Sequence, residues 1–176
     1  DARTAWIVAL ANAGQTAAPS QPRLASTADA GKTWASADSP CPGSEQGFTF
    51  NSASEGWLFC RASSGLQVYR TTDTARTWQP LGLIEPSNPT AATALTLAGV
   101  TRLSDQVAVA ALNDGTIAIT RDGGKSWKQA LAAGEPLQGV ERHGAADVWV
   151  LGNRQIYRSA DAGQTWTTQT LDYHPA

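Results

Sequence analysis

The residues that could perform chemistry in this chain are few, and they form no complete catalytic set. A glycoside hydrolase needs two carboxyl groups about 5–10 Å apart, and the spacing of Glu85, Asp114 and Glu135 permits such a pair without requiring it. His143 and His174 do not accompany a serine and an aspartate as a catalytic triad would require. With two histidines, two cysteines and no Cys-x-x-Cys pair, no zinc site of ordinary spacing can be built. We therefore predict no catalytic residue, metal or cofactor, and a non-catalytic role is favoured while enzymatic activity stays open.

Length, charge and hydropathy exclude further classes of function. The 176 residues suit one domain. The 13 Lys and Arg residues against 15 Asp and Glu residues give a net charge of -2, without the basic excess typical of nucleic-acid binding. No apolar run approaches the roughly 18 residues of a membrane-spanning helix. Neither nucleic acid nor a membrane span is therefore expected.

The two cysteines, Cys41 and Cys60, bear on the compartment. In a chain rich in Ala, Ser, Thr and Gln they favour one disulfide in an exported protein, and two unpaired, half-buried thiols are the alternative. The chain contains no methionine, so we expect a processed or trimmed polypeptide. The expected location is secreted, periplasmic or at the cell surface.

An octet of the pattern Ser/Thr-x-Asp-x-Gly-x-Thr/Ser-Trp occurs four times. The copies lie at residues 27–34, 71–78, 120–127 and 159–166, and the second has Ala75 in place of the glycine. Their spacing is close to the ~40–45 residues of a four-stranded propeller blade. A short alternating run lies on either side of each octet, so each octet is expected to join two antiparallel strands. The repeats span approximately residues 1–38, 46–82, 97–131 and 138–171, which predicts one all-β propeller domain, or propeller segment, over residues 1–176.

Each conserved position of the octet has a structural role in a hairpin turn. The Asp side chain can accept hydrogen bonds from backbone N–H groups about two residues on, the glycine is expected at positive φ, and the Trp closes the hairpin onto its blade. At Ala75 the same backbone would cost about 1 kcal/mol or more, unless that turn has a different geometry. These structural residues are Asp29, Gly31, Trp34, Asp73, Trp78, Asp122, Gly124, Trp127, Asp161, Gly163 and Trp166.

The other tryptophans belong to a strand that precedes the octet. Trp6, Trp57 and Trp149 occupy equivalent places, and Ala108 is assigned to that place in the third repeat. The first repeat begins directly at this strand, so its blade should lack the innermost strand. The chain is then either a segment of a longer propeller, which we favour, or a small propeller closed by an unusual strand. An incomplete first blade could also associate with another chain.

The four octets resemble the Asp-box (bacterial neuraminidase) repeats of sialidases, sortilin-type receptors, some xyloglucanases and photosystem II assembly-factor-like proteins. The resemblance covers nearly the whole chain and implies a β-propeller in which the boxes are structural. It implies no single function, because members of this family do unrelated things. The sialidase Arg-Ile-Pro motif is absent, and Pro22-Arg23-Leu24 has a different order.

Candidate binding residues lie in the loops that do not repeat. In a propeller, the turns between the first and second strands of a blade share one face with the octet turns. The opposite face carries the remaining loops, and long loops on a rigid scaffold often carry function. The polar candidates in those loops are Asn12, Gln21, Arg61, Glu85, Asn113, Asp114, Glu135 and Arg154.

The sequence therefore predicts an exported, non-catalytic platform that binds a protein, peptide or glycan. One alternative is a segment of a glycan-acting, sialidase-like hydrolase. The other is an assembly or stability factor, for which a patch of arginines on one face would be needed, whereas the arginines here are scattered along the sequence.

Overall fold

The computed structural model describes residues 3–9, 23–41 and 44–171. Within them, strands form four antiparallel sheets, of which the first has three strands and the others four. We call these sheets blades 1 to 4 in chain order. The only helix in the described part of the chain is the short 3-10 helix η1 (Pro89–Ala94), between blades 2 and 3.

The strands of each blade follow one another along the chain and pair with their sequence neighbours. Blade 1 consists of β1 (Ala5–Ala9), β2 (Arg23–Thr27) and β3 (Ala35–Asp38). Blade 2 consists of β4 (Glu45–Phe50), β5 (Gly56–Ala62), β6 (Gly65–Thr71) and β7 (Gln79–Ile84). Blade 3 consists of β8 (Leu97–Arg102), β9 (Ala108–Leu112), β10 (Thr116–Thr120) and β11 (Lys128–Ala132). Blade 4 consists of β12 (Leu137–His143), β13 (Asp147–Gly152), β14 (Gln155–Ser159) and β15 (Thr167–Thr170).

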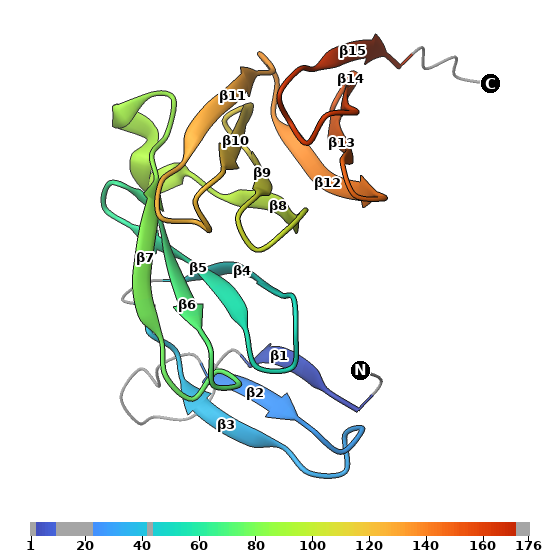
Figure 1. Cartoon of the computed structure of the whole chain (residues 1–176). Coiled ribbons are helices and arrows are strands. Elements are labelled where there is room, and N and C mark those ends of the chain that lie inside the picture. The colour runs from blue at the N-terminus through green and yellow to red at the C-terminus, as the bar shows by residue number, and fades with distance from the viewer. Residues whose placement is uncertain (1–2, 10–22, 42–43, 172–176) are drawn as a thin grey trace, which may run out of the picture.

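The blades stand side by side in an open arc, with β1, β4, β8 and β12 on its concave side and β3, β7, β11 and β15 outside (Figure 1). This is the radial arrangement of a propeller. The sequence-based prediction of an all-β propeller segment is confirmed, and the described residues of the first blade form three strands.

Each octet forms a turn that its own side chains hold together. In blade 3, Asp122 Oδ1 accepts the backbone N–H of Ser126 at 2.9 Å, and its Oδ2 accepts the Ser126 hydroxyl at 2.6 Å. The Thr120 hydroxyl donates to Asp122 and accepts from Gly124 N, both at 2.9 Å. The main backbone donor to the carboxylate therefore lies four residues on, rather than the two residues we expected.

Two consecutive residues of every octet turn have positive φ. At the glycine position φ is 85° in Gly31, 90° in Gly124 and 80° in Gly163. Ala75 adopts the same conformation with φ of 62°, so the idea of a different geometry for the second turn is wrong. The residue before it is also in the left-handed region in all four turns, which the sequence did not indicate; these residues are Ala30, Thr74, Gly123 and Ala162.

Strand register corrects one assignment. In blade 2, Trp57 lies opposite Arg70, the residue before the octet. In blade 3, the residue opposite Ile119, which likewise precedes its octet, is Val109 and not Ala108. Val109 therefore takes the tryptophan position of the third blade, because strand pairing places it, and not Ala108, opposite the residue that precedes the octet.

The hydrophobic core is divided into three clusters, one between each pair of adjacent blades. The first contains Leu24 of blade 1 and Leu58 of blade 2. The other two join blades 2 and 3 and blades 3 and 4 in the same way. The octet tryptophan of each later blade packs on the cluster before it, as Trp78, Trp127 and Trp166 do. The octet therefore attaches its blade to the preceding one as well as closing its own hairpin.

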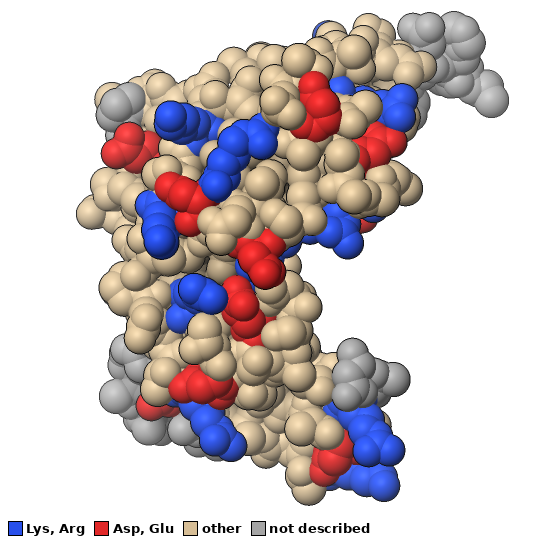
Figure 2. All heavy atoms as spheres, viewed as in Figure 1, with Lys and Arg blue, Asp and Glu red and all other residues tan. Residues whose placement is uncertain are grey.

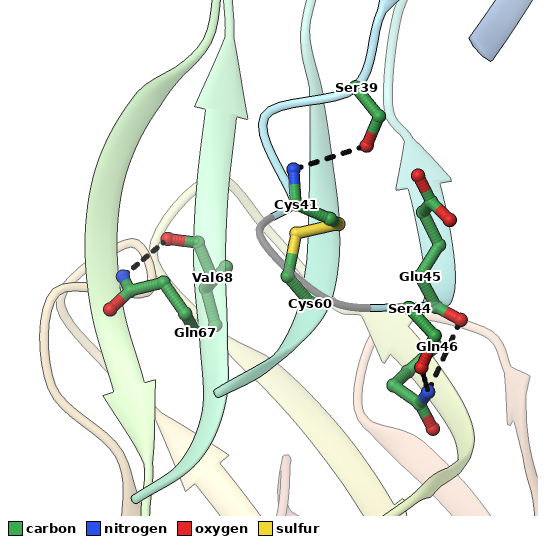
Figure 3. The surroundings of a disulfide bond; sticks show 8 residues. All are labelled: Ser39, Cys41, Ser44, Glu45, Gln46, Cys60, Gln67 and Val68. Carbon is green, nitrogen blue, oxygen red and sulfur yellow. Dashed lines mark hydrogen bonds between the residues drawn. A yellow bond between two sulfur atoms is a disulfide. The ribbon is translucent and has the colours of Figure 1, made fainter. Parts of the chain in front are cut away.

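The predicted disulfide is confirmed between Cys41 and Cys60, both buried (Figure 3). It joins the segment after β3 to the second strand of blade 2, and no free cysteine exists among the described residues. The bond fits an extracellular or periplasmic protein, because disulfides persist in oxidising compartments.

The described residues contain no helical segment with the length and apolar character needed to cross a bilayer.

Two octet glycines provide a matched test of packing against the preceding blade. A Cβ on Gly124 would lie 2.8 Å from Leu81 Cδ2 and 3.2 Å from the Trp57 ring, whereas one on Gly31 would meet only Trp34 at 4.0 Å. We expect Gly124→Ala to lower the free energy of unfolding by roughly 1–3 kcal/mol more than Gly31→Ala. Urea titrations of both variants would check this difference. Equal losses would show that backbone strain alone is responsible.

The octet carboxylates should make stability depend on acid pH. Hydrogen bonds, chiefly from the Thr or Ser hydroxyl four residues on, lower the pKa of Asp29, Asp73 and Asp122 from 3.8 to about 2. A carboxylate with a lowered folded-state pKa stabilises the fold above its unfolded pKa, and this contribution is lost as pH falls. We therefore expect the urea midpoint to fall between pH 4 and 2, with a shallower fall in Asp122→Asn. An identical pH dependence in that variant would contradict this cause.

Candidate binding site on the inner rim

The innermost strands place Phe50, Arg102 and Arg142 at equivalent positions. Phe50 pairs with Gly56 in blade 2, and Arg102 pairs with Ala108 in blade 3. Arg142 holds the corresponding place in blade 4. Because the repeats align these strands, their ends meet at one edge of the arc. That edge is the face of the octet turns, and we call it the inner rim.

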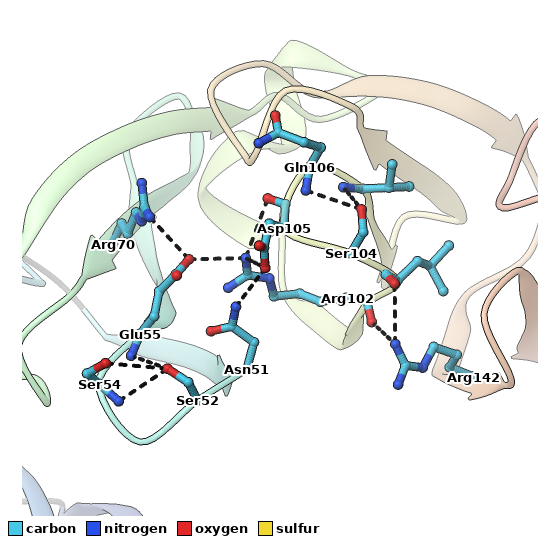
Figure 4. Close-up of polar contacts among 12 residues, drawn as sticks. Asn51, Ser52, Ser54, Glu55, Arg70, Arg102, Ser104, Asp105, Gln106 and Arg142 are labelled. Atoms are coloured by element: carbon cyan, nitrogen blue, oxygen red, sulfur yellow. Dashed lines mark hydrogen bonds and ion pairs between the residues drawn. The ribbon is translucent and has the colours of Figure 1, made fainter.

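Arg102 is buried in the wall between blades 2 and 3. Its guanidinium carbon lies 4.2 Å from the centre of the Trp57 ring, a cation–π contact that strengthens on desolvation. Its Nη2 lies 3.2 Å from Glu55 Oε1 and 3.9 Å from Asp105 Oδ1. Arg70 Nη2 lies 3.3 Å from the same Glu55 oxygen (Figure 4). One carboxylate of blade 2 is thus shared by two arginines.

Arg142 is exposed and lies at the other side of Arg102 (Figure 4). Its Nη1 donates to the carbonyl oxygen of Arg102 at 2.8 Å. On the blade 2 side, Asn51 Nδ2 donates to Asp105 Oδ1 at 3.1 Å. Hydrogen bonds therefore connect three successive blades along the rim.

These residues surround a hollow of about 390 Å³ between the inner strands. Its lining consists of Thr49, Phe50, Asn51, Val100, Thr101, Arg102, Leu103, Ser104, Asp105 and Arg142. A second hollow of about 140 Å³ shares Phe50 and Asn51 with it and continues to Thr4 and Trp6 of blade 1. The space-filling view shows the concave side of the arc and a surface on which charges of both signs are interspersed (Figure 2).

The rim carries a small excess of positive charge. Arg70, Arg102 and Arg142 stand against Glu55 and Asp105. The exposed guanidinium of Arg142 is bound to protein only through Nη1 in the contacts described. A guanidinium presents its N–H groups as a planar fork that matches a carboxylate, so the rim is suited to an anionic group.

The predicted loop residues have varied positions. Asn12 and Gln21 lie outside the described residues. Arg61 is within β5, so its assignment to a loop was wrong. Glu85 follows β7 and lines a separate hollow of about 240 Å³. Arg154 is exposed after β13.

The other three loop candidates hold the loops of the opposite face together. Asn113 accepts from Thr96 N at 2.7 Å, and Asp114 accepts from Ser87 N at 3.0 Å. Burial alone would raise the pKa of Asp114, but hydrogen bonds from Ser87 and from Thr116 outweigh it and lower that pKa.

Glu135 and Tyr157 lie within hydrogen-bond distance of each other. The Tyr157 hydroxyl lies 2.7 Å from Gln155 Oε1, 2.9 Å from Ala133 O and 3.2 Å from Glu135 Oε1. The Glu135 carboxylate also accepts the backbone N–H groups of Arg154 and Gln155. Tyr157 is buried, and burial together with the negative charge of Glu135 raises its pKa to about 12. This environment favours a phenol that donates a hydrogen bond over one that ionises to a nucleophile.

The rim arginines were missed in the sequence analysis, which described the arginines as scattered along the chain. The structure brings Arg70, Arg102 and Arg142 together. The signal was present, because two of these arginines occupy the same strand position in successive repeats.

Comparison with known proteins supports the fold. No protein-family model matches this chain, and no curated protein is similar to it in sequence. The structure is similar to YCF48 from Cyanidioschyzon merolae, with a TM-score of 0.57 and 15% identity over 84% of this chain and 44% of that one. It is also similar to an ancestral GH74 enzyme, with a TM-score of 0.58 and 14% identity over 75% of this chain and 19% of that one.

A third similar structure is the GH74 xyloglucanase from Xanthomonas campestris, with a TM-score of 0.50 and 17% identity. The match covers 74% of this chain and 24% of that enzyme. The chain thus spans less than half the length of each of these proteins. At such low identity the similarity shows a propeller fold and assigns no activity.

Glu55 and Asp147, which hold equivalent positions two residues before Trp57 and Trp149, provide a test of how the rim is stabilised. Glu55 pairs with the buried Arg102, whereas Asp147 of blade 4 pairs with Arg158, whose side chain is 46% exposed. We expect Glu55→Gln to lower the free energy of unfolding by about 1.5–3 kcal/mol. Asp147→Asn should cost about 0–1 kcal/mol. Thermal or urea unfolding of both variants would measure this, and equal costs would refute the role assigned to Glu55.

Proposed function

We propose that this chain is a non-catalytic propeller platform that binds an extended protein segment or peptide along its inner rim. An acidic group of the ligand is held beside Arg142. The observation that carries the proposal is the hollow of about 390 Å³ with the buried Arg102 and the exposed Arg142 in its lining.

Charge supports an acidic group in the ligand. Arg142 uses one nitrogen to hold the neighbouring strand, which fixes its position and leaves the rest of its fork for a ligand. Preorganised guanidinium groups bind carboxylates with short, charge-assisted hydrogen bonds. The buried Arg102 adds positive charge beneath the surface of the hollow. Its Nε and Nη1 have no hydrogen-bond partner among the described residues.

Shape supports an extended ligand. The two hollows share Phe50 and Asn51, so together they follow the inner strands from blade 1 to blade 4. The larger one lies within the range of about 300–1,000 Å³ of typical ligand sites. Beside the smaller one, β1 is the inner edge of blade 1, and among the described residues it pairs only with β2. Backbone groups at a sheet edge can pair with an added extended segment.

The other functions considered have weaker support. The carboxylates of Asp114 and Glu135, which could have served a hydrolase, are engaged by backbone N–H groups. A glycan ligand has no rim feature that favours it over a peptide.

We also propose that residues 1–176 act as one domain-like unit in an exported setting, either secreted, periplasmic or at the cell surface.

Binding of matched peptides tests this function. Two fluorescein-labelled peptides of about ten residues, long enough to span several strands, would be compared. They are identical except that one contains glutamates where the other contains glutamines. We expect the acidic peptide to bind more tightly by fluorescence polarisation. Arg142→Gln should weaken that binding roughly 10-fold or more.

Arg121→Gln provides the control for Arg142→Gln. Arg121 is also exposed and also donates to a carbonyl of the next blade, that of Ala162, but it is not in the rim hollow. Its substitution should leave peptide binding unchanged. Equal affinity for the two peptides, or equal effects of the two substitutions, would contradict the proposed site.

A further inference from the structure

One position on the third strand of the blades carries side chains of very different size. In blades 2, 3 and 4 it is occupied by Tyr69, Ala118 and Tyr157, each two residues before the Thr or Ser that begins an octet. Strand pairing aligns the three residues in the same way. Their partners on the second strand are Leu58, Ala110 and Val150. Blade 3 therefore has a methyl group where blades 2 and 4 have a phenol.

This position faces the preceding blade. Tyr69 packs on the core cluster between blades 1 and 2, and Tyr157 is part of the cluster between blades 3 and 4. Ala118 belongs to the cluster between blades 2 and 3. Two of the interfaces between blades thus contain a tyrosine ring at this position, and the interface between blades 2 and 3 does not.

A hollow of about 240 Å³ adjoins Ala118 in that interface. Its lining includes Ile84, Ser87, Thr116, Ala118 and Trp127. Glu85 and Lys128 also line it and are exposed, so the hollow is open to solvent. A cavity of about 150 Å³ is large enough to bind benzene, so this hollow has room for one aromatic ring with a polar substituent.

Blade 4 shows which groups receive a phenol at this position. The Tyr157 hydroxyl lies 2.7 Å from Gln155 Oε1 and 2.9 Å from the carbonyl oxygen of Ala133. Gln155 is two residues before the tyrosine on β14, and Ala133 directly follows β11 of the preceding blade. The hydroxyl is therefore bound by its own strand and by the blade on which it packs.

The hollow beside Ala118 contains the counterparts of these groups. Thr116 is two residues before Ala118, in the place of Gln155, and Glu85 follows β7 as Ala133 follows β11. The Thr116 side chain is buried, and its Oγ1 has no hydrogen bond of ordinary geometry. Thr116 helps to lower the pKa of the neighbouring Asp114, which directs the hydroxyl proton toward that carboxylate. The lone pairs of Oγ1 are then free to accept a hydrogen bond.

The walls of the hollow are fixed by contacts within the chain. Asp114 Oδ2 accepts the backbone N–H of Ser87 at 3.0 Å and its hydroxyl at 2.9 Å, which holds the segment after β7. Trp127 lies edge to face with Phe59 of blade 2, with ring centres 6.2 Å apart. A preformed site loses less conformational freedom on binding, which favours a small ligand.

We propose that the hollow between blades 2 and 3 binds a phenol, supplied either by a tyrosine side chain of a partner or by a free hydroxyaryl compound. The ring lies beside Ala118 and Trp127, and its hydroxyl donates to Thr116 Oγ1. This site is independent of the function proposed for the inner rim, because the two hollows share no lining residue.

Titration with p-cresol, which is the tyrosine side chain without its backbone, tests the site. Amide chemical shifts in two-dimensional NMR should change and saturate with a Kd of about 1 mM or below. Ala118→Tyr should abolish this binding, because its own ring then fills the hollow as Tyr157 does in the next interface. Arg142→Gln is the control in the rim hollow and should leave p-cresol binding unchanged.

Thr116→Val tests the hydrogen bond to the ligand. It should weaken p-cresol binding roughly 5-fold, and it should not weaken binding of toluene, which has the same ring without the hydroxyl. Circular dichroism would confirm that the variants are folded. Should Ala118→Tyr fail to fold, this comparison of two ligands decides the proposal.

N-acetyltyrosinamide distinguishes the two sources of the phenol. If it binds and is displaced by p-cresol, the site accepts a tyrosine side chain from a partner, whereas binding of p-cresol alone indicates a free compound. The proposal would be overturned if p-cresol showed no saturable binding up to about 10 mM, ten times the expected Kd. Binding that persists in a folded Ala118→Tyr variant, or equal effects of Thr116→Val on p-cresol and toluene, would also overturn it.

Discussion

The structure depends on one backbone constraint, the pair of left-handed residues at the tip of each octet turn. This conformation brings the turn back on itself, so that an Asp carboxylate and a Thr or Ser hydroxyl can hold the backbone N–H groups inside it. Left-handed backbone disfavours a Cβ, and the glycines at this position in blades 3 and 4, Gly124 and Gly163, let their turns lie against the neighbouring sheet. The same feature therefore satisfies the local conformation and the packing between blades.

Repetition of that contact creates the surface on which function is proposed. Because each blade is placed on the one before by the same octet, the inner strands follow one another in register around the concave side (Figure 1). When the same residue type recurs at one strand position in successive blades, those residues therefore lie in a row along the concave side. Arg102 and Arg142 form such a row, and the octet turns themselves contribute the scaffold.

The rim is stabilised by unequal versions of one repeated ion pair. In blade 2, Glu55 is shared by Arg70 and by Arg102 of the next blade, and the second arginine is buried against Trp57. In blade 4, Asp147 binds only Arg158 of its own blade. The difference arises because blade 2 has a following blade in the structure, whose inner strand supplies the extra guanidinium.

The sequence by itself determined the blades, their order and the three-stranded first blade, and it favoured the disulfide that the structure contains. The signals for the blades were octets whose hydrogen bonds join residues at most four apart, so they are written in short windows of sequence. It also led us to the turns as structural sites, and it placed the candidate binding residues on the face opposite the proposed rim site. Asn113, Asp114 and Glu135 turned out to hold loops together, since hydrogen bonds between loops leave no trace in a single sequence.

Only the tertiary structure decided which side chains meet on the inner rim. Arg102 and Glu55 are 47 residues apart, and their contact exists because two blades stack in one particular register. It also decided that Val109, rather than Ala108, holds the tryptophan position of blade 3, since strand pairing fixes which residue faces the next sheet. Short-range patterns determine the units of this protein, and the packing between the units determines its surface chemistry.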